Sequence, residues 1–165
     1  CIAMALLRDG WEEDYYGNPS IYPIGCVGRL VSVQPLPDGR SDILLQGLAR
    51  YEIREEYEEQ PYREARIRLI SDEPEPSLAP EVRQGLMTVL ERYLRAREDA
   101  ATWEGMFRHE VSDEILVNTL ATYLDCTPLE KQFLLEAEGL HQRARRLNDL
   151  LQFMLHDQHG AKGWG

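Results

Sequence analysis

Three cysteines are the side chains best suited to nucleophilic chemistry, and they lie far apart at Cys1, Cys26 and Cys126. A catalytic thiol needs a nearby base or cation that lowers its pKa. Neither Cys26, in a predicted strand, nor Cys126, beside a predicted helix start, has a base adjacent in sequence. A small buried hydrophobe is the competing interpretation of both. The odd number and wide spacing argue against a disulfide framework and favour a reducing, cytoplasmic compartment.

Metal-ligating residues are equally sparse. Zinc requires Cys or His ligands at short spacings, and His109-Glu110 is not followed by the second histidine of a metalloprotease helix. His156 and His159 lie three apart, where the plain interpretation is a favourable interaction with a helix C-terminus. The sequence also lacks a phosphate-binding loop, a dinucleotide fingerprint and a nucleophile elbow. We therefore predict no metal, no cofactor and no enzyme. An enzyme of unrecognised type that uses Cys26 or a carboxylate is the open alternative.

One loop carries a concentration of aromatic residues. Between residues 8 and 23 the sequence is rich in Gly, Asn, Pro and Asp with little periodicity, which predicts a long loop of the kind that is often functional. Large amphipathic rings on loops are common anchors of protein interfaces. The alternative is a lid that folds back over the β core. The predicted protein-binding residues are Trp11, Tyr15, Tyr16, Ile21 and Tyr22.

The net charge of −11 excludes some partner classes. An acidic surface repels phosphate backbones and anionic lipid headgroups, so nucleic acid and membrane surfaces are poor partners. No apolar run approaches the ~18 residues of a membrane span. Self-association is left open.

Strand periodicity dominates residues 1–73. Residues 2–7 predict a strand already under way, and Gly25–Leu36 and Ser41–Leu48 flank a Pro37-Asp38-Gly39 turn. The segments 49–54 and 64–69 alternate apolar and charged residues, the pattern of half-buried antiparallel strands. Ala49, Tyr51, Ile53, Ala65, Ile67 and Leu69 are the residues predicted to face inward.

Helical periodicity dominates residues 81–157, after a proline-rich linker at 74–80. The first helix has an apolar stripe from Val82 to Leu94. The second begins after Ser112, an N-cap residue. Thr127, Pro128 and Glu130 predict a capped third helix that ends at Gly139. The fourth carries a stripe ending at Met154 and stops at Gly160, with a flexible tail at 158–165.

Two blocks of this sequence resemble a known family. Gly25–Val31, the Leu36–Arg40 turn and Ile43–Tyr51 are similar in order to the glycine–basic–aliphatic strand, the P-D-G turn and the "G-L-x-R" strand of the Lon protease N-terminal domain. Leu129–Glu136 resembles that domain's "E-K-Q-x-L-L-E" helix. The likeness is most specific from Gly25 to Tyr62 and extends more weakly from Ile2 to about Leu155.

The resemblance implies an α+β fold: a twisted, partly closed antiparallel β unit, or pseudo-barrel, followed by a C-terminal helical bundle. It also implies a bacterial, non-catalytic module that recognises unfolded or tagged polypeptides, without the Lon motor or peptidase. The alternative is an adaptor that docks a specific folded partner, such as a protease or chaperone ATPase, or self-associates. Because the family begins upstream of Cys1, we expect an upstream segment or a partner chain to cover the first strand's edge.

Overall fold

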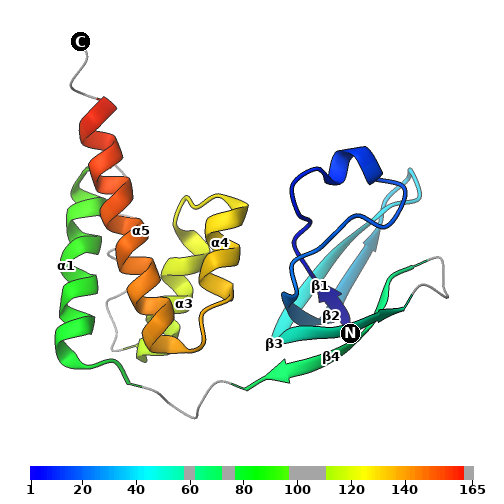
Figure 1. Ribbon diagram of the computed structural model, residues 1–165, viewed down its shortest axis with the longest axis horizontal. Helices are drawn as coiled ribbons and strands as arrows, with labels where there is room; N and C mark the ends of the chain where they lie inside the picture. The colour runs from blue at the N-terminus through cyan, green and yellow to red at the C-terminus, as the bar shows by residue number, and fades with distance from the viewer. Residues whose placement is uncertain (58–61, 72–76, 97–110, 162–165) are drawn as a thin grey trace. The chain divides into compact units, whose positions relative to one another are not determined.

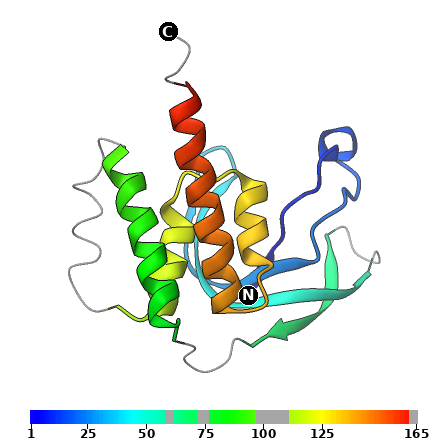
Figure 2. The ribbon, with the colours of Figure 1, turned by 60° about the vertical axis from the view of Figure 1, so that its left-hand side comes forward.

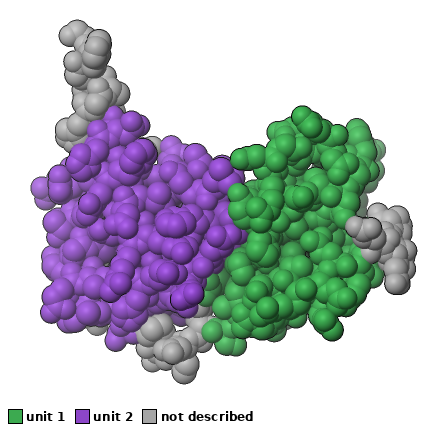
Figure 3. All heavy atoms as spheres, viewed as in Figure 1, with its two compact units in different colours: residues 1–71 green, residues 72–165 purple. Residues whose placement is uncertain are grey.

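The computed structural model describes residues 1–57, 62–71, 77–96 and 111–161, in two compact units that comprise residues 1–71 and 72–165 (Figure 3). Unit 1 contains a four-stranded antiparallel sheet and unit 2 contains helices (Figure 1). The predicted α+β class is confirmed, whereas partial closure of the sheet into a pseudo-barrel and the bundle arrangement of the helices stay predictions. Residues 74–76 of the predicted linker, His109 and the tail at 162–165 lie outside the described residues.

Four strands follow one another in the sheet in chain order. They are β1 (Ile2–Met4), β2 (Ile24–Pro35), β3 (Ser41–Tyr57) and β4 (Glu64–Ile70), and each pairs antiparallel with the next. The two strands predicted at 41–48 and 49–54 are therefore a single strand. The β2–β3 pairing shifts register around Leu48. The strand therefore stays paired although its alternation of apolar and polar residues changes at this point.

The turn between β2 and β3 forms where the sequence predicts it. Gly39 adopts a φ of 86°, in the left-handed region that suits glycine, and Leu36 and Arg40 close the turn with an N–H···O bond of 2.8 Å. The Asp38 carboxylate accepts the Arg40 amide at 3.0 Å. Local residues thus determine this hairpin.

Two predicted orientations in the sheet are wrong. Arg50 was expected to face solvent but is 8% exposed, because its position on β3 is flanked by Cys26 of β2 and Ile70 of β4. Leu69 was expected to face inward but is 56% exposed. It lies near the end of β4, an edge strand with a neighbour on one side only among the described residues. The alternation of apolar and charged residues along a strand does not show whether the strand has a neighbour on one side or on both.

A tyrosine on β3 reaches across β2 to β1. The Tyr51 hydroxyl donates to the Met4 carbonyl oxygen at 3.1 Å, and the side chain is 2% exposed. Tyr51 pairs in register with Gly25 of β2, and a Cβ at residue 25 would overlap both the Tyr51 hydroxyl and the Met4 oxygen. Because Gly25 has no side chain, Tyr51 can pass over β2 and bond β1.

Unit 2 contains the helices α1 (Pro80–Ala96), α3 (Asp113–Tyr123), α4 (Pro128–Leu135) and α5 (Leu140–Ala161). Their starts match the predicted capping signals. The Ser112 hydroxyl accepts the Ile115 amide at 3.3 Å, and Thr127 and Glu130 form a reciprocal capping box.

Two helix ends differ from the prediction. α4 ends at Leu135 rather than Gly139, because the Ala137 amide bonds the Leu134 carbonyl oxygen three residues back and so leaves the α-helical ladder. The next amide, that of Glu138, bonds the Gln142 side chain of the next helix at 2.6 Å. α5 passes through Gly160 to Ala161, so backbone helix covers residues 158–161, which we predicted as part of a flexible tail.

The core of unit 2 forms around α5, which contacts α1, α3 and α4 (Figure 2). The predicted stripes supply it, with Leu155 more deeply buried than Met154. None of the described helices combines the length and apolarity that a membrane span needs. The most completely buried core residues include Leu86, Leu90, Leu116, Val117, Leu120, Leu147 and Leu151.

We predict that Gly25→Ala destabilises the protein by roughly 1–3 kcal/mol. The added methyl group would overlap the Met4 carbonyl oxygen and the Tyr51 ring, and both are held in place by the sheet. Tyr51→Phe keeps the ring but loses the hydrogen bond to Met4, with an expected cost of about 1 kcal/mol. Urea unfolding followed by circular dichroism measures both.

Gly85→Ala is the matched control, because a Cβ there has nothing within 4 Å and the residue lies inside α1. Alanine should stabilise this helix by about 0.5–1 kcal/mol. Equal stability of the Gly25→Ala protein and the unmodified chain would contradict the role assigned to this contact.

A second prediction concerns alkaline pH. Burial, and secondarily the neighbouring Cys26 thiol, raise the pKa of the Tyr51 phenol above its ordinary value. The unfolded chain then loses this proton at about pH 10 while the folded chain retains it, so the stabilisation is complete below that pH and is lost as pH rises through the folded-state pKa.

Tyr51→Phe should be less stable than the unmodified chain at neutral pH but should lose less stability above about pH 10. Urea titrations of the two proteins at matched pH values measure the difference. Parallel pH profiles would rule out this titration.

Candidate functional site

The loop between β1 and β2 is closed at its base by backbone hydrogen bonds. Leu7 and Ile21 form an isolated antiparallel bridge. On either side of it, Arg8 N donates to Ser20 O, and Tyr22 N donates to Leu6 O, both at 2.8 Å. This neck holds the two ends of the loop together, so a segment with little regular structure has a defined path.

Inside the loop, a short 3₁₀ helix η1 (Trp11–Asp14) is followed by a turn built on Asp14. The Asp14 carbonyl oxygen accepts the Gly17 amide at 2.9 Å, and the Asp14 carboxylate accepts the Asn18 amide at 3.2 Å. Aspartate bonds its neighbouring backbone in this way in many turns. The turn places Tyr15 and Tyr16 at the tip of the loop.

The aromatic residues at the tip pack on one another and stay accessible. The Trp11 and Tyr15 ring centroids are 5.7 Å apart, and Tyr15 meets Tyr16 edge to face at 5.0 Å. Tyr16 is 97% exposed and Tyr15 is 58% exposed. The three rings thus form an aromatic cluster that is not buried by the remainder of the described chain.

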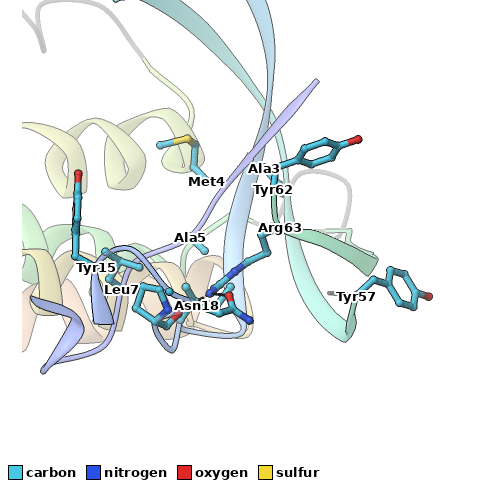
Figure 4. Close-up of a pocket in the computed structure, with 12 residues that line it drawn as sticks. Ala3, Met4, Ala5, Leu7, Tyr15, Asn18, Tyr57, Tyr62 and Arg63 are labelled. Carbon is cyan, nitrogen blue, oxygen red and sulfur yellow. Dashed lines mark hydrogen bonds between the residues drawn. The ribbon is translucent and has the colours of Figure 1, made fainter. Parts of the chain in front are cut away.

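An open cavity of about 870 Å³ lies beside this loop (Figure 4). Tyr15 lines it on the loop side, while Tyr57, at the end of β3, and Tyr62, just before β4, line it on the opposite side with rings that extend away from the loop. The remaining lining residues are mostly apolar and come from β1 and the loop: Ala3, Met4, Ala5, Leu7, Gly17, Asn18, Pro19 and Ile21, together with Arg63. Its size and composition suit a small group of apolar side chains.

Arg63 fastens the loop to the start of β4. Its guanidinium reaches toward the loop (Figure 4), where it hydrogen-bonds the Asn18 side chain and the Pro19 carbonyl oxygen, the latter at 2.6 Å. Arg63 Nε also lies 3.6 Å from a Glu56 carboxylate oxygen. The guanidinium is therefore occupied by partners from within unit 1.

The structure separates the five sequence-predicted residues into three environments. Tyr15 and Ile21 line the cavity, and Trp11 and Tyr16 flank Tyr15 in the aromatic cluster. Tyr22 lies apart from the cavity lining, half-buried below the Arg8 guanidinium at 4.7 Å. Whether any of them binds a protein stays a prediction.

Sequence reasoning missed the other side of the cavity. Neither Tyr57 nor Tyr62 is among the residues that the sequence predicts to bind a protein. The sequence does contain a signal that could have indicated this side of the cavity: two tyrosines flank residues 58–61, and Arg63 follows directly after the second. Their convergence with the loop depends on strand pairing that is remote in sequence.

The cysteines and His156 are not among the residues that line this cavity. Cys26 is half-buried, and its thiol is 3.8 Å from the Val27 carbonyl oxygen. Burial is the main factor that raises the pKa of the Cys126 thiol, which disfavours the nucleophilic thiolate. His156 Nδ1 lies 2.7 Å from the Gln152 carbonyl oxygen of its own helix. In the described residues, no group of three or more His, Cys, Asp or Glu side chains could hold a metal ion.

Comparison with solved structures identifies the same architecture. The N-terminal domain of a Mycobacterium avium complex Lon protease aligns with a TM-score of 0.61 at 15% identity, covering 92% of this chain and 90% of that one. A Lon N-terminal domain protein from Xanthomonas campestris aligns with a TM-score of 0.56 at 18% identity, covering 92% and 88%. At these identities the likeness concerns the fold.

Sequence comparison identifies longer relatives. The Lon protease of Flavobacterium johnsoniae is 31% identical over 137 residues, which cover 81% of this chain and 17% of the relative. The Lon protease of Trichlorobacter lovleyi is 30% identical over 163 residues, which cover 91% of this chain and 19% of the relative. The chain thus spans less than a fifth of the length of these proteases.

The matching family model is the substrate-binding domain of the ATP-dependent protease La (LON), and it covers residues 1–152. This match includes both units and agrees with the structural neighbours and the full-length relatives. The chain therefore belongs to the Lon substrate-binding domain family.

Proposed function

We propose that this chain is a non-catalytic module that recognises unfolded or tagged polypeptides, and that the cavity of unit 1 is where a client segment binds. The observation that carries the proposal is an open cavity in which Tyr15 and Tyr62 remain largely exposed although they lie beside apolar surface. Membership of a substrate-binding domain family supports it. The proposed function includes neither the ATP hydrolysis nor the proteolysis of full-length Lon proteases.

The cavity has the chemistry to hold an extended segment. Met4, Leu7 and Ile21 offer aliphatic surface, and Tyr15 and Tyr62 offer rings with one apolar face and a hydroxyl that can hydrogen-bond a peptide. Burial of a client's apolar side chain contributes about 25 cal/mol for each Å² removed from water, from which the cost of ordering the segment is subtracted. We therefore expect weak binding at a single site, strengthened when a client carries several segments.

Partial closure of the sheet is part of this proposal. Residues from β1 and from the β3–β4 connection line the same cavity, although β1 and β4 are the two edge strands. This shared lining supports a sheet that curls into a pseudo-barrel. Such a curl would bring the loop and the β3–β4 connection to the same cavity.

The alternative function is an adaptor that docks one folded partner. Tyr16 favours it, because this ring is almost fully exposed and lies outside the cavity lining. An adaptor should form one complex of fixed stoichiometry, whereas a recognition module should bind many unfolded sequences. Size-exclusion chromatography with multi-angle light scattering separates these outcomes.

We predict that Tyr62→Ala weakens binding of a permanently unfolded protein, such as fluorescently labelled reduced and carboxymethylated casein, by about tenfold. Loss of one aromatic anchor from an interface costs on the order of 1–2 kcal/mol, which gives a change of that size. Fluorescence anisotropy titration of the full chain measures it.

Tyr123→Ala is the matched control, since Tyr62 and Tyr123 are 62% and 61% exposed and Tyr123 belongs to unit 2. Its affinity for casein should stay unchanged, and circular dichroism should show that both variants fold. Casein binding that is absent from the unmodified chain, or equally weakened in both variants, would reject the cavity as the recognition site.

A further inference from the structure

We infer that the cavity selects basic segments, in which lysine or arginine lies next to an aromatic or aliphatic residue. This inference rests on the proposed function and adds to it the charge class of the bound polypeptide. Its basis is a group of carboxylates that form no ion pair with the described residues and that lie beside exposed tyrosine rings.

The carboxylates lie in η1, where Glu12, Glu13 and Asp14 follow one another and are all exposed. None of the three forms an ion pair with any residue among the described ranges, whereas most other acidic residues of the sheet do. None of the three lines the cavity, but the Asp14 carboxylate accepts the amide of Asn18, which does. Three negative charges are therefore available to a ligand.

The geometry of η1 brings one of these charges next to the cavity wall. Side chains three residues apart in a 3₁₀ helix lie above one another, so Glu12 shares a face with Tyr15, whose backbone continues the helical conformation at the C-cap. Tyr15 lines the cavity. Glu13 and Asp14 lie within one turn of Glu12 in η1. All three carboxylates are therefore closer to one another than the Debye length, which is about 10 Å at 0.1 M salt.

The cation of the cavity lining does not offset this charge. The Arg63 guanidinium is paired with Glu56 and hydrogen-bonded to Asn18 and Pro19. Its charge is balanced by its own partner. Arg8, whose Nε donates to the Ile21 carbonyl oxygen at 3.1 Å, adds one positive charge to the loop, against the four negative charges of Asp9, Glu12, Glu13 and Asp14. The formal charge of the loop beside the described cavity is therefore negative. An acidic client segment or a nucleic-acid phosphate would be repelled there.

Exposed tyrosines beside carboxylates form a surface suited to cationic side chains. A guanidinium or ammonium is attracted both to the face of an aromatic ring and to a nearby carboxylate. The loop itself contains such a pair, with Arg8 over the Tyr22 ring at 4.7 Å, and Arg146 lies over Phe133 at 4.2 Å in unit 2. Tyr15, Tyr16 and Tyr62 offer similar rings that remain exposed.

Three labelled peptides of equal length and equal aromatic content test the inference on the full chain: one with lysine and arginine, one with serine and glutamine, and one with aspartate and glutamate. Anisotropy titrations at low salt should rank them basic, neutral, acidic, with the basic peptide bound about tenfold more tightly than the acidic one. The preference should shrink at about 1 M salt, where the Debye length falls to roughly 3 Å.

The double variant Glu12→Gln and Glu13→Gln should weaken binding of the basic peptide by about three- to fivefold and leave the neutral peptide unchanged, as expected for two exposed charges near the ligand. Glu114→Gln with Glu138→Gln is the control. It removes two exposed carboxylates from unit 2, so the net charge changes equally.

Loss of the preference in the η1 variant alone supports the inference. Equal loss in both variants, or neutral and basic peptides bound equally by the unmodified chain, overturns it while the proposed function stands. If none of the three peptides binds, the recognition function itself is rejected.

Discussion

The hydrogen bond from the Tyr51 hydroxyl to the Met4 carbonyl is the contact on which the candidate site depends. It crosses β2 where Gly25 has no side chain, and it joins β3 to a β1 of only three residues. So short a strand has few ladder bonds of its own. Because the aromatic loop leaves β1 directly after Met4, this contact determines where the loop starts and therefore where the cavity can form.

Order in the loop comes from polar contacts, which leaves its aromatic faces accessible. The Leu7–Ile21 bridge closes the neck, Asp14 builds the internal turn, and Arg63 fastens the far side. If the rings themselves had to supply stability by burial, they would be unavailable to a ligand. Polar contacts therefore give this irregular loop a defined path while its tyrosines at the tip stay exposed.

Signals that act over a few residues were enough to predict much of the fold. The Pro37-Asp38-Gly39 turn and the Thr127–Glu130 capping box appear where the sequence places them, because each is completed by atoms within four residues. The apolar stripe of α5 predicts its buried face for the same reason. The prediction was wrong for Arg50, Leu69 and the end of α4, where a neighbouring strand or the next helix decides the outcome.

The sequence by itself determined the α+β class, the two kinds of periodicity and a loop rich in aromatic residues, since these depend on local residue order. Only the tertiary structure decided that Tyr57, Tyr62 and Arg63 lie across a cavity from Tyr15, and that Tyr22 lies away from it. Arg63 and Asn18 are 45 residues apart. Their meeting depends on how β1, β2, β3 and β4 pair, which no short window of sequence contains.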